Sequence, residues 1–219
     1  MIREFKLYLS APVQDIPNDY YHQMHGFVSS LLGENKYKEQ GNRYSYSMLN
    51  NGTLSEGKWS FNDMPTFNVR IGDKETFDNF KSNIIKGEAK LFGMEVVGIK
   101  EIYVSTDNSI FFINHDTPLR LSNKFERIFR KLTIDERKQA EEYILHNIKT
   151  QMDKFGLLMP KDTIVSIVRE YQRRIVKTKG VYSNTRRFSL RVNASDEVKE
   201  FIMLHGIGRS TGFGFGYLY

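Results

Sequence analysis

Hydrophobic and polar residues alternate at the start of the chain, and this alternation predicts a strand. Phe5, Leu7 and Leu9 fall on one face of an extended segment, whereas Lys6 and Tyr8 fall on the other. A strand with one apolar face is typical of an antiparallel sheet that is covered on one side only. We therefore expect the chain to open with a strand of such a sheet.

Helical and extended patterns then follow one another through the first half of the chain. A helix is expected to run to about Leu32, with Asn18 or Asp19 as its N-cap and Gly33 as its end. A second amphipathic helix is expected at residues 74–85. The expected strands, separated by Asn/Gly turns, are residues 43–49, 57–61, 66–71 and 92–104.

The second half of the chain nearly repeats this order. Residues 134–154 have apolar side chains at four-residue spacing and are expected to form a long helix. The other expected elements are strands at 109–113, 118–121, 163–176, 181–192 and 213–218 and a helix after Ser195. Two β-α-β-β-α-β units predict an α+β fold of tandem ferredoxin-like (RRM-like) modules with antiparallel sheets. We place the N-terminal module at 1–105 and the C-terminal module at 106–219.

Charge is unevenly distributed between the two predicted modules. Lys and Arg number 12 against 13 Asp and Glu in residues 1–104, and 20 against 13 in residues 105–219. The second half therefore has a net charge of +7, within a chain whose total is +6. A basic excess on one part of a protein favours a polyanion partner, of which nucleic acid is the commonest.

The composition excludes several kinds of chemistry. The chain has no cysteine, which removes disulfides, thiolate zinc sites and cysteine nucleophiles. It has no His-Glu-x-x-His or Asp-x-Asp motif, so we expect no metal and no cofactor. No apolar run approaches the roughly 20 residues of a membrane span, and the N-terminus lacks the hydrophobic region of a signal peptide. We therefore expect a cytoplasmic protein with no membrane partner.

A glycine-rich stretch, GIGRSTGFGFG, runs from Gly206 to Gly216. It fits the pattern G-h-G-x5-G-h-G, where h is a hydrophobic residue, and it lies between an expected helix and the last expected strand. No Gly-Lys-Ser/Thr follows, so the stretch is not a nucleotide P-loop. Glycines in such a loop allow sharp turns and close packing on neighbouring backbone, which is also the purely structural interpretation.

This motif, together with the tandem module order and an early helix that carries histidine, resembles the repeat-associated (RAMP) superfamily of CRISPR proteins. Its position near the chain end resembles the CRISPR repeat-processing endoribonucleases within that superfamily, and the resemblance covers most of the chain. The resemblance implies that the loop packs beside an RNA-binding cleft. It implies that backbone approaches RNA or the adjoining helix at Gly206, Gly208, Gly214 and Gly216. Arg209 is the one charged side chain of the loop, and we expect it to contact phosphate.

Basic residues are concentrated in the last expected hairpin. Within residues 186–192 three apolar side chains alternate with Arg187, Ser189 and Arg191, so one strand face offers guanidinium groups. Guanidinium groups bind phosphate bidentately and would line an anionic groove, although a solvated strand face has the same pattern. The candidate RNA ligands of this hairpin are Arg173, Arg174, Lys177, Lys179, Arg186, Arg187 and Arg191.

The first expected helix carries two histidines. His25 falls at the edge of the core stripe, on the same flank as Tyr21, whereas His22 lies nearly opposite the core. Taken alone, such a histidine is more often simply solvated. The resemblance, however, implies a catalytic histidine in or just after this helix, with a tyrosine or lysine nearby. The implied set is His25 with His22 in reserve, Tyr21 in preference to Tyr20, and Lys36 with Lys38 as its rival.

The resemblance therefore implies a metal-independent endoribonuclease that cleaves CRISPR repeat RNA in a precursor transcript and gives guide RNAs. The 2′-OH would attack the adjacent phosphorus, leaving a 2′,3′-cyclic phosphate and a 5′-hydroxyl. Histidine titrates near neutrality and suits the acid or base role, while lysine or tyrosine can donate to the charged phosphorane. Its partners would be the repeat RNA and CRISPR effector subunits, and it would be a monomer or a homodimer.

Two other classes of function stay open at this point. A non-catalytic RNA-binding subunit of a CRISPR effector complex would have the same modules and loop without needing a histidine, so substitution of His25 separates it from the enzyme. A ferredoxin-like protein with a small-molecule ligand would leave the basic strands unexplained. RNA affinity that is insensitive to salt would favour that last class.

Overall fold

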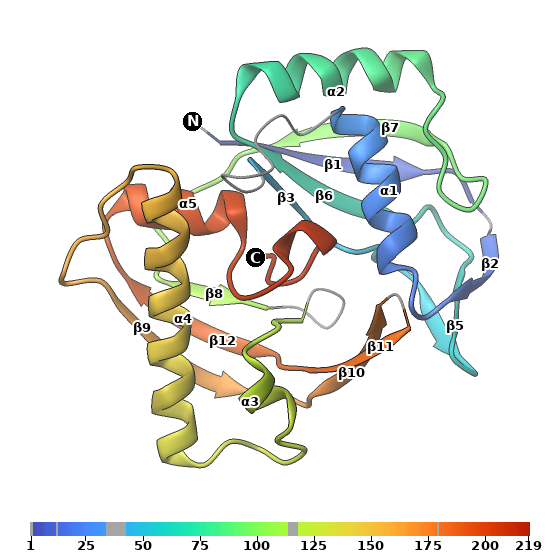
Figure 1. Ribbon diagram of the computed structural model, residues 1–219. Helices are drawn as coiled ribbons and strands as arrows, with labels where there is room; N and C mark the ends of the chain where they lie inside the picture. The colour runs from blue at the N-terminus through green and yellow to red at the C-terminus, as the bar shows by residue number, and fades with distance from the viewer. Residues whose placement is uncertain (1, 12, 34–42, 114–117, 179) are drawn as a thin grey trace.

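The structure is a computed structural model that describes residues 2–11, 13–33, 43–113, 118–178 and 180–219. It contains two α+β units with antiparallel sheets (Figure 1). The fold is thus the predicted pair of ferredoxin-like units. Within the described residues, no helix has the length and apolar composition needed to cross a membrane.

The first unit has a four-stranded sheet in the order β3-β6-β1-β7. Helices α1 and α2 cover it, and their apolar residues share one core with the sheet (Figure 1). The predicted alternation of the first strand is confirmed, because Phe5, Leu7 and Leu9 are buried in that core. The elements are β1 (Arg3–Leu9), α1 (Tyr21–Leu32), β3 (Tyr44–Tyr46), β6 (Thr66–Ile71), α2 (Lys74–Lys86) and β7 (Val96–Ile102).

The second unit has a three-stranded sheet in the order β8-β12-β9. The predicted last strand is reduced to a bridge between Leu218 and Ile113 at the β8 edge, preceded by the short helix η1 (Thr211–Phe213). The apolar row of α4 is buried, as its spacing predicts. The elements are β8 (Ile110–Phe112), α3 (Asn123–Glu126), α4 (Ile134–Lys154), β9 (Ile164–Glu170), β12 (Phe188–Asn193) and α5 (Asp196–His205).

The connection between β7 and β8 contains the boundary that we place between residues 105 and 106. Division of the chain there stays a proposal. Helix α5 packs against β3 and β6 of the first unit as well as on its own sheet, so it lies between the two units.

The first helix begins later than the sequence predicts. Neither Asn18 nor Asp19 caps α1, whose N-cap is Tyr20 without a side-chain hydrogen bond. The Asn18 amide oxygen instead accepts hydrogen bonds from the Trp59 indole nitrogen at 3.1 Å and from the Arg174 guanidinium at 2.5 Å. Asn18 therefore joins the two units, which is why its helix-capping capacity is not used. The predicted end of α1 at Gly33 is confirmed.

The two long strands predicted in the second half are each divided in two. Their distal parts form a separate hairpin, β10 (Arg174–Thr178) with β11 (Val181–Thr185). Val176 of this hairpin is buried in the core of the first unit. The face of the hairpin that carries Val176 packs on the first unit, and the hairpin forms a sheet separate from that of its own unit. A second small sheet in the order β2-β5-β4 joins β2 (Val13–Pro17), β5 (Lys58–Phe61) and β4 (Thr53–Ser55).

A buried ion pair on the first sheet receives contacts from the chain end. Glu4 and Arg70 lie opposite each other on β1 and β6, with Nε and Oε2 2.7 Å apart. Arg70 also donates to the carbonyl oxygen of Leu218 at 2.7 Å, and the Tyr217 hydroxyl donates to Glu4 at 2.9 Å. Burial raises the pKa of Tyr217 well above its ordinary value, so this hydroxyl stays a donor. The last residues therefore complete the polar contacts of the first strands.

Candidate functional site

The two halves of the glycine-rich loop pack against each other. The amide of Ile207 donates to the carbonyl oxygen of Gly216 at 3.1 Å. A side chain at Gly216 would overlap the Ile207 carbonyl, and the φ of +67° at Gly216 is itself unfavourable for other residues. The repeated G-h-G pattern thus allows close contact between the two backbone segments.

The glycines of the loop are buried against protein atoms. A Cβ at Gly208 would lie 2.5 Å from the carbonyl oxygen of Arg120, and one at Gly214 would lie 2.8 Å from the Tyr46 ring. All four glycines that the prediction places near RNA or the adjoining helix, Gly206, Gly208, Gly214 and Gly216, are buried, so approach of their backbone to RNA stays a prediction that this structure does not support. Their role in this structure is the structural one that the sequence left open.

The loop packs against helix α1 through an aromatic stack. The rings of Tyr21 and Phe215 are 4.9 Å apart at their centroids and nearly parallel, at 3°. The Tyr46 hydroxyl of β3 adds a hydrogen bond to the carbonyl oxygen of Gly212 at 2.9 Å. The loop is thereby held beside the flank of α1 that carries Tyr21.

His25 follows Tyr21 by one helical turn on that flank of α1. The residue is partly exposed, and its Nδ1 is buried. His22 is exposed on another side of the helix. Of the two histidines, His25 is thus the one that the helix places on the loop side.

Tyr21 and Lys36 are the other two predicted catalytic residues. Tyr21 is only 1% exposed, so its ring supports the loop and its side chain does not face a ligand in this structure. Lys36 and its rival Lys38 lie outside the described residues. Tyr20 is also buried, and its hydroxyl accepts a hydrogen bond from the amide of Leu49 at 3.2 Å. His25 is therefore the one predicted catalytic residue that is both described and partly exposed.

The prediction that Arg186 binds RNA is wrong. Its side chain is 1% exposed and pairs with Glu170 at 2.8 Å. It also donates to the carbonyl oxygens of Arg130, at 2.8 Å, and Ile128. Burial lowers its pKa from the ordinary value, and Glu170 opposes that shift. Arg186 is thus a structural residue that holds the segment between α3 and α4.

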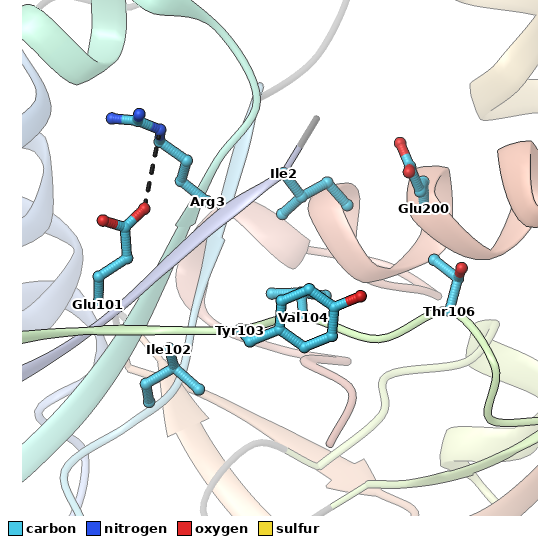
Figure 2. A pocket seen from close by; sticks show the side chains of 8 residues that line it. All are labelled: Ile2, Arg3, Glu101, Ile102, Tyr103, Val104, Thr106 and Glu200. Atoms are coloured by element: carbon cyan, nitrogen blue, oxygen red, sulfur yellow. Dashed lines mark ion pairs between the residues drawn. The ribbon is translucent and has the colours of Figure 1, made fainter.

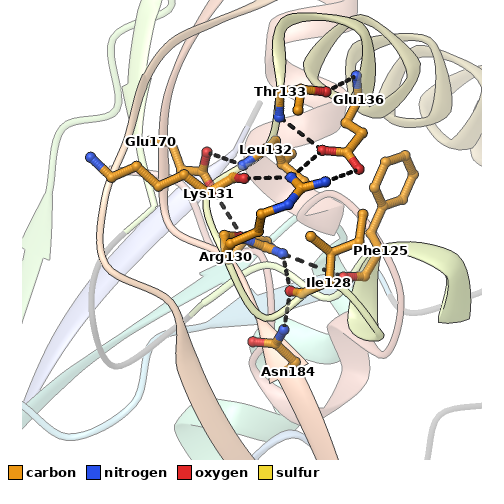
Figure 3. A network of polar contacts seen from close by, with 10 residues as sticks. Phe125, Ile128, Arg130, Lys131, Leu132, Thr133, Glu136, Glu170 and Asn184 are labelled. Atoms are coloured by element: carbon orange, nitrogen blue, oxygen red, sulfur yellow. Dashed lines mark hydrogen bonds and ion pairs between the residues drawn. The ribbon is translucent and has the colours of Figure 1, made fainter.

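That segment is fixed by several polar contacts, which Figure 3 shows between Phe125 and Glu136. Glu170 accepts a hydrogen bond from the amide of Leu132 at 3.0 Å. Arg130 pairs with Glu136 at 2.6 Å, and this hydrogen bond, with that from the Thr133 backbone, lowers the pKa of Glu136 to about 2. The segment therefore has a defined conformation although it is not a helix or strand.

The remaining predicted basic ligands lie in several places. Arg173 lies over the Phe129 ring at 5.3 Å, Lys177 over Tyr182 at 5.6 Å, and Arg187 over Tyr171 at 5.3 Å. Arg174 donates a hydrogen bond to Asn18 of the first unit, as described above. Lys179 lies outside the described residues. Two are exposed: Arg191 and Arg209. The described cations are therefore distributed over the hairpin, the strand β12 with its flanking residues, and the glycine-rich loop.

Arg120 is a loop-supporting residue that the sequence analysis missed. It donates to the Ser210 hydroxyl at 3.1 Å and pairs with Glu126 at 3.2 Å. Its carbonyl oxygen accepts from the amide of Arg209 at 2.9 Å. The amide oxygen of Asn147 on α4 adds a hydrogen bond from the Gly208 amide at 2.9 Å. No local pattern distinguishes Arg120 or Asn147, because their partners lie far away in the sequence.

A pocket of about 500 Å³ at the junction of β1, β7 and α5 is less suited to RNA (Figure 2). Its charged lining residues are Arg3, Glu101 and Glu200. Arg3 already pairs with Glu101 at 3.8 Å, so the lining carries an excess of negative charge. Carboxylates repel phosphate, which disfavours this pocket as an RNA site. Among the described residues, no cluster of His, Asp or Glu could hold a metal ion.

The class defined by this fold is a tandem ferredoxin-like protein whose glycine-rich loop packs on the first helix. No family model and no curated protein sequence matches the chain. Solved structures do match, over nearly the full length of both chains.

The chain is similar to a CRISPR-associated protein Cas6, with a TM-score of 0.76, 14% identity and coverage of 100% of this chain and 99% of the other. It is similar to a Cas6-related protein from Pyrococcus furiosus, with a TM-score of 0.73, 19% identity and coverage of 100% and 98%. A RAMP protein described as binding different RNA substrates has a TM-score of 0.72, 18% identity and coverage of 99% and 98%. At these identities the likeness shows that the fold is that of Cas6 and RAMP proteins.

The backbone contact within the loop gives a direct prediction for Gly216. Gly216→Ala should destabilise the protein by about 2–5 kcal/mol, since a left-handed φ costs about 1–2 kcal/mol and a packing overlap about 1–3 kcal/mol. Gly57→Ala is the matched control, because Gly57 has a φ of +76° and no atom within 4 Å of its added Cβ. Urea unfolding would measure both variants. Equal losses of stability would contradict a specific contact in the loop.

Proposed function

We propose that this protein is a metal-independent endoribonuclease that binds and cleaves CRISPR repeat RNA, with His25 as general acid or base. The observation that carries the proposal is the Tyr21–Phe215 stack, which holds the glycine-rich loop beside the His25 flank of α1. The basic residues of the second unit supply charge for phosphate. The similar structures support an RNA partner, since they include Cas6 complexes with a product and with a substrate mimic.

The chemistry follows from the groups available. A histidine near the scissile phosphate can take the proton of the 2′-OH or give one to the 5′-oxygen. An exposed guanidinium such as that of Arg209 can stabilise the negative charge that builds up on phosphorus. The reaction needs no water, so the products would be a 2′,3′-cyclic phosphate and a 5′-hydroxyl.

The test is cleavage of repeat RNA transcribed from the CRISPR arrays of the source genome, in EDTA, with the product ends mapped. We expect one cut within the repeat and a 2′,3′-cyclic phosphate. A 2′-deoxy substitution at the mapped position should abolish the cut, because the nucleophile is removed. Products with 3′-hydroxyl ends, or cleavage only when Mg²⁺ is added, would contradict the mechanism.

A non-catalytic RNA-binding subunit of a CRISPR complex is the second candidate. It is favoured by the burial of Tyr21, which leaves His25 without the predicted tyrosine at the ligand surface. Tight binding of the repeat RNA without any cleavage would establish this candidate in place of the enzyme.

A further inference from the structure

A pocket of about 490 Å³ lies between the β10–β11 hairpin and the segment that follows α3. Two aromatic side chains in its lining are largely exposed, Phe129 at 60% and Tyr182 at 69%. Single exposed apolar side chains are common, but several that line one pocket together mark a candidate binding site. Ile175, on the same hairpin face as Tyr182, adds a third exposed apolar residue.

A cationic side chain lies over each aromatic ring of this pocket. Arg173 lies over Phe129 and Lys177 over Tyr182, as described above. Exposed rings alongside guanidinium and ammonium groups are the combination by which proteins hold single-stranded nucleic acid, with bases stacked on the rings and phosphates on the cations. The carboxylate of Glu126 in the lining does not oppose this, because Arg120 neutralises it at 3.2 Å.

Asn184 adds a hydrogen-bonding group to the pocket lining. The residue is 6% exposed, and its Nδ2 donates to the carbonyl oxygen of Ile128 at 2.7 Å, which fixes the orientation of the amide. Its Oδ1 is buried and accepts no hydrogen bond from any described residue. A buried acceptor without a donor is unfavourable, so this position favours a ligand with an N–H group.

The pocket is connected to the glycine-rich loop. The amide oxygen of Asn123 in its lining accepts a hydrogen bond from the Arg209 guanidinium at 2.6 Å. On the other side of the pocket, the carbonyl oxygen of Ile128 accepts hydrogen bonds from both Asn184 and the buried Arg186. Hydrogen bonds therefore connect the pocket lining both to the glycine-rich loop and to the segment that Arg186 holds.

We propose that this pocket binds one unpaired nucleobase of the RNA, stacked on Phe129 and Tyr182 and donating an N–H to Asn184. This inference rests on the proposed function insofar as it requires an RNA ligand, but it does not require cleavage. The base is extrahelical, because a base within a duplex is stacked on its neighbours on both faces. The pocket thereby selects repeats that present an unpaired base at a fixed distance from the cut.

The test is a scan of the repeat RNA in which each nucleotide in turn is made abasic, with binding measured for wild type and variants. We expect one position at which base removal weakens binding to the wild type by about five- to a hundredfold, the range for loss of one stacked base. The double variant Phe129→Ala, Tyr182→Ala should bind the intact RNA more weakly by a similar factor. Removal of the base at that position should then cause no further loss of binding to the double variant. Both residues are exposed, so the variant should fold.

The matched control is Tyr103→Ala, which removes an 89% exposed tyrosine at the separate acidic pocket (Figure 2). This variant should bind the intact RNA as tightly as the wild type does. Its binding should also be weakened by base removal at the same position. A base analogue without its exocyclic amine at that position should weaken binding to the wild type only.

Three outcomes overturn the inference. A double variant that binds intact RNA as the wild type does would show that the pocket is not used, while leaving the proposed function in place. A double variant that keeps the same abasic sensitivity would place that base elsewhere. Failure of the wild type to bind any repeat RNA would overturn the proposed function together with the pocket.

Discussion

His25→Ala should lower the rate of RNA cleavage by about 10²- to 10⁴-fold, the usual contribution of a positioned acid or base. The reason is geometric, since α1 places His25 one turn from the Tyr21 ring that stacks on the glycine-rich loop. Binding of the repeat RNA should be retained, because the proposed phosphate ligands and the base pocket lie on the second unit. Single-turnover cleavage in EDTA and a binding titration would separate the two effects.

His22→Ala is the control for this experiment. His22 is on the same helix but exposed away from the core, so its loss should leave the cleavage rate unchanged. If His22→Ala lost activity and His25→Ala did not, the assignment of the two histidines would be reversed. If the wild type cuts and both variants cut at the same rate, the catalytic group lies elsewhere.

Arg186→Leu should destabilise the protein by about 3–5 kcal/mol, the loss found when one partner of a buried ion pair is removed. Glu170 would be left charged and buried, and the carbonyl oxygens of Ile128 and Arg130 would lose their donor. Urea unfolding at neutral pH would measure the loss.

Arg191→Leu is the matched control, because Arg191 is on the same strand and exposed. Its stability should stay within about 0.5 kcal/mol of the wild type, as for most surface substitutions. If Arg191 contacts phosphate, the variant should instead bind RNA more weakly and with a smaller dependence on salt. An Arg186→Leu protein as stable as the wild type would contradict the structural role of the buried pair.

The sequence contained a sign of this difference between neighbouring arginines. Arg186 has the same parity as the buried Phe188 and Leu190, whereas Arg187 has the opposite parity. The strand pattern alone therefore indicated burial for Arg186. The charge of Arg186 nevertheless favours an exposed position. Burial becomes possible only with a partner such as Glu170, which the fold supplies.

Local patterns predicted the elements well and their ends less well. The apolar faces of β1 and α4 follow directly from spacing, as does the end of α1 at Gly33. The division of the last two strands has no local sign, because the hairpin turns toward a core that Val176 shares with the first unit.

The candidate site was predictable only in part. The motif identified the loop, and helical periodicity placed His25 on the flank that the loop approaches. The base pocket could not be foreseen, because Phe129 and Tyr182 are brought together by the long-range contacts of Arg186 and Asn184. Phe129 lies in the segment between α3 and α4 and Tyr182 on β11, so no common local pattern links them.

The contacts of the chain end with Glu4 and Arg70 have a consequence for biosynthesis. A ribosome delivers β1 and β6 well before it delivers Tyr217 and Leu218. Until then the ion pair between these strands lacks two of its hydrogen-bonding partners and is open to water. The first unit therefore reaches its final packing only after residues of the distant second unit have been synthesised.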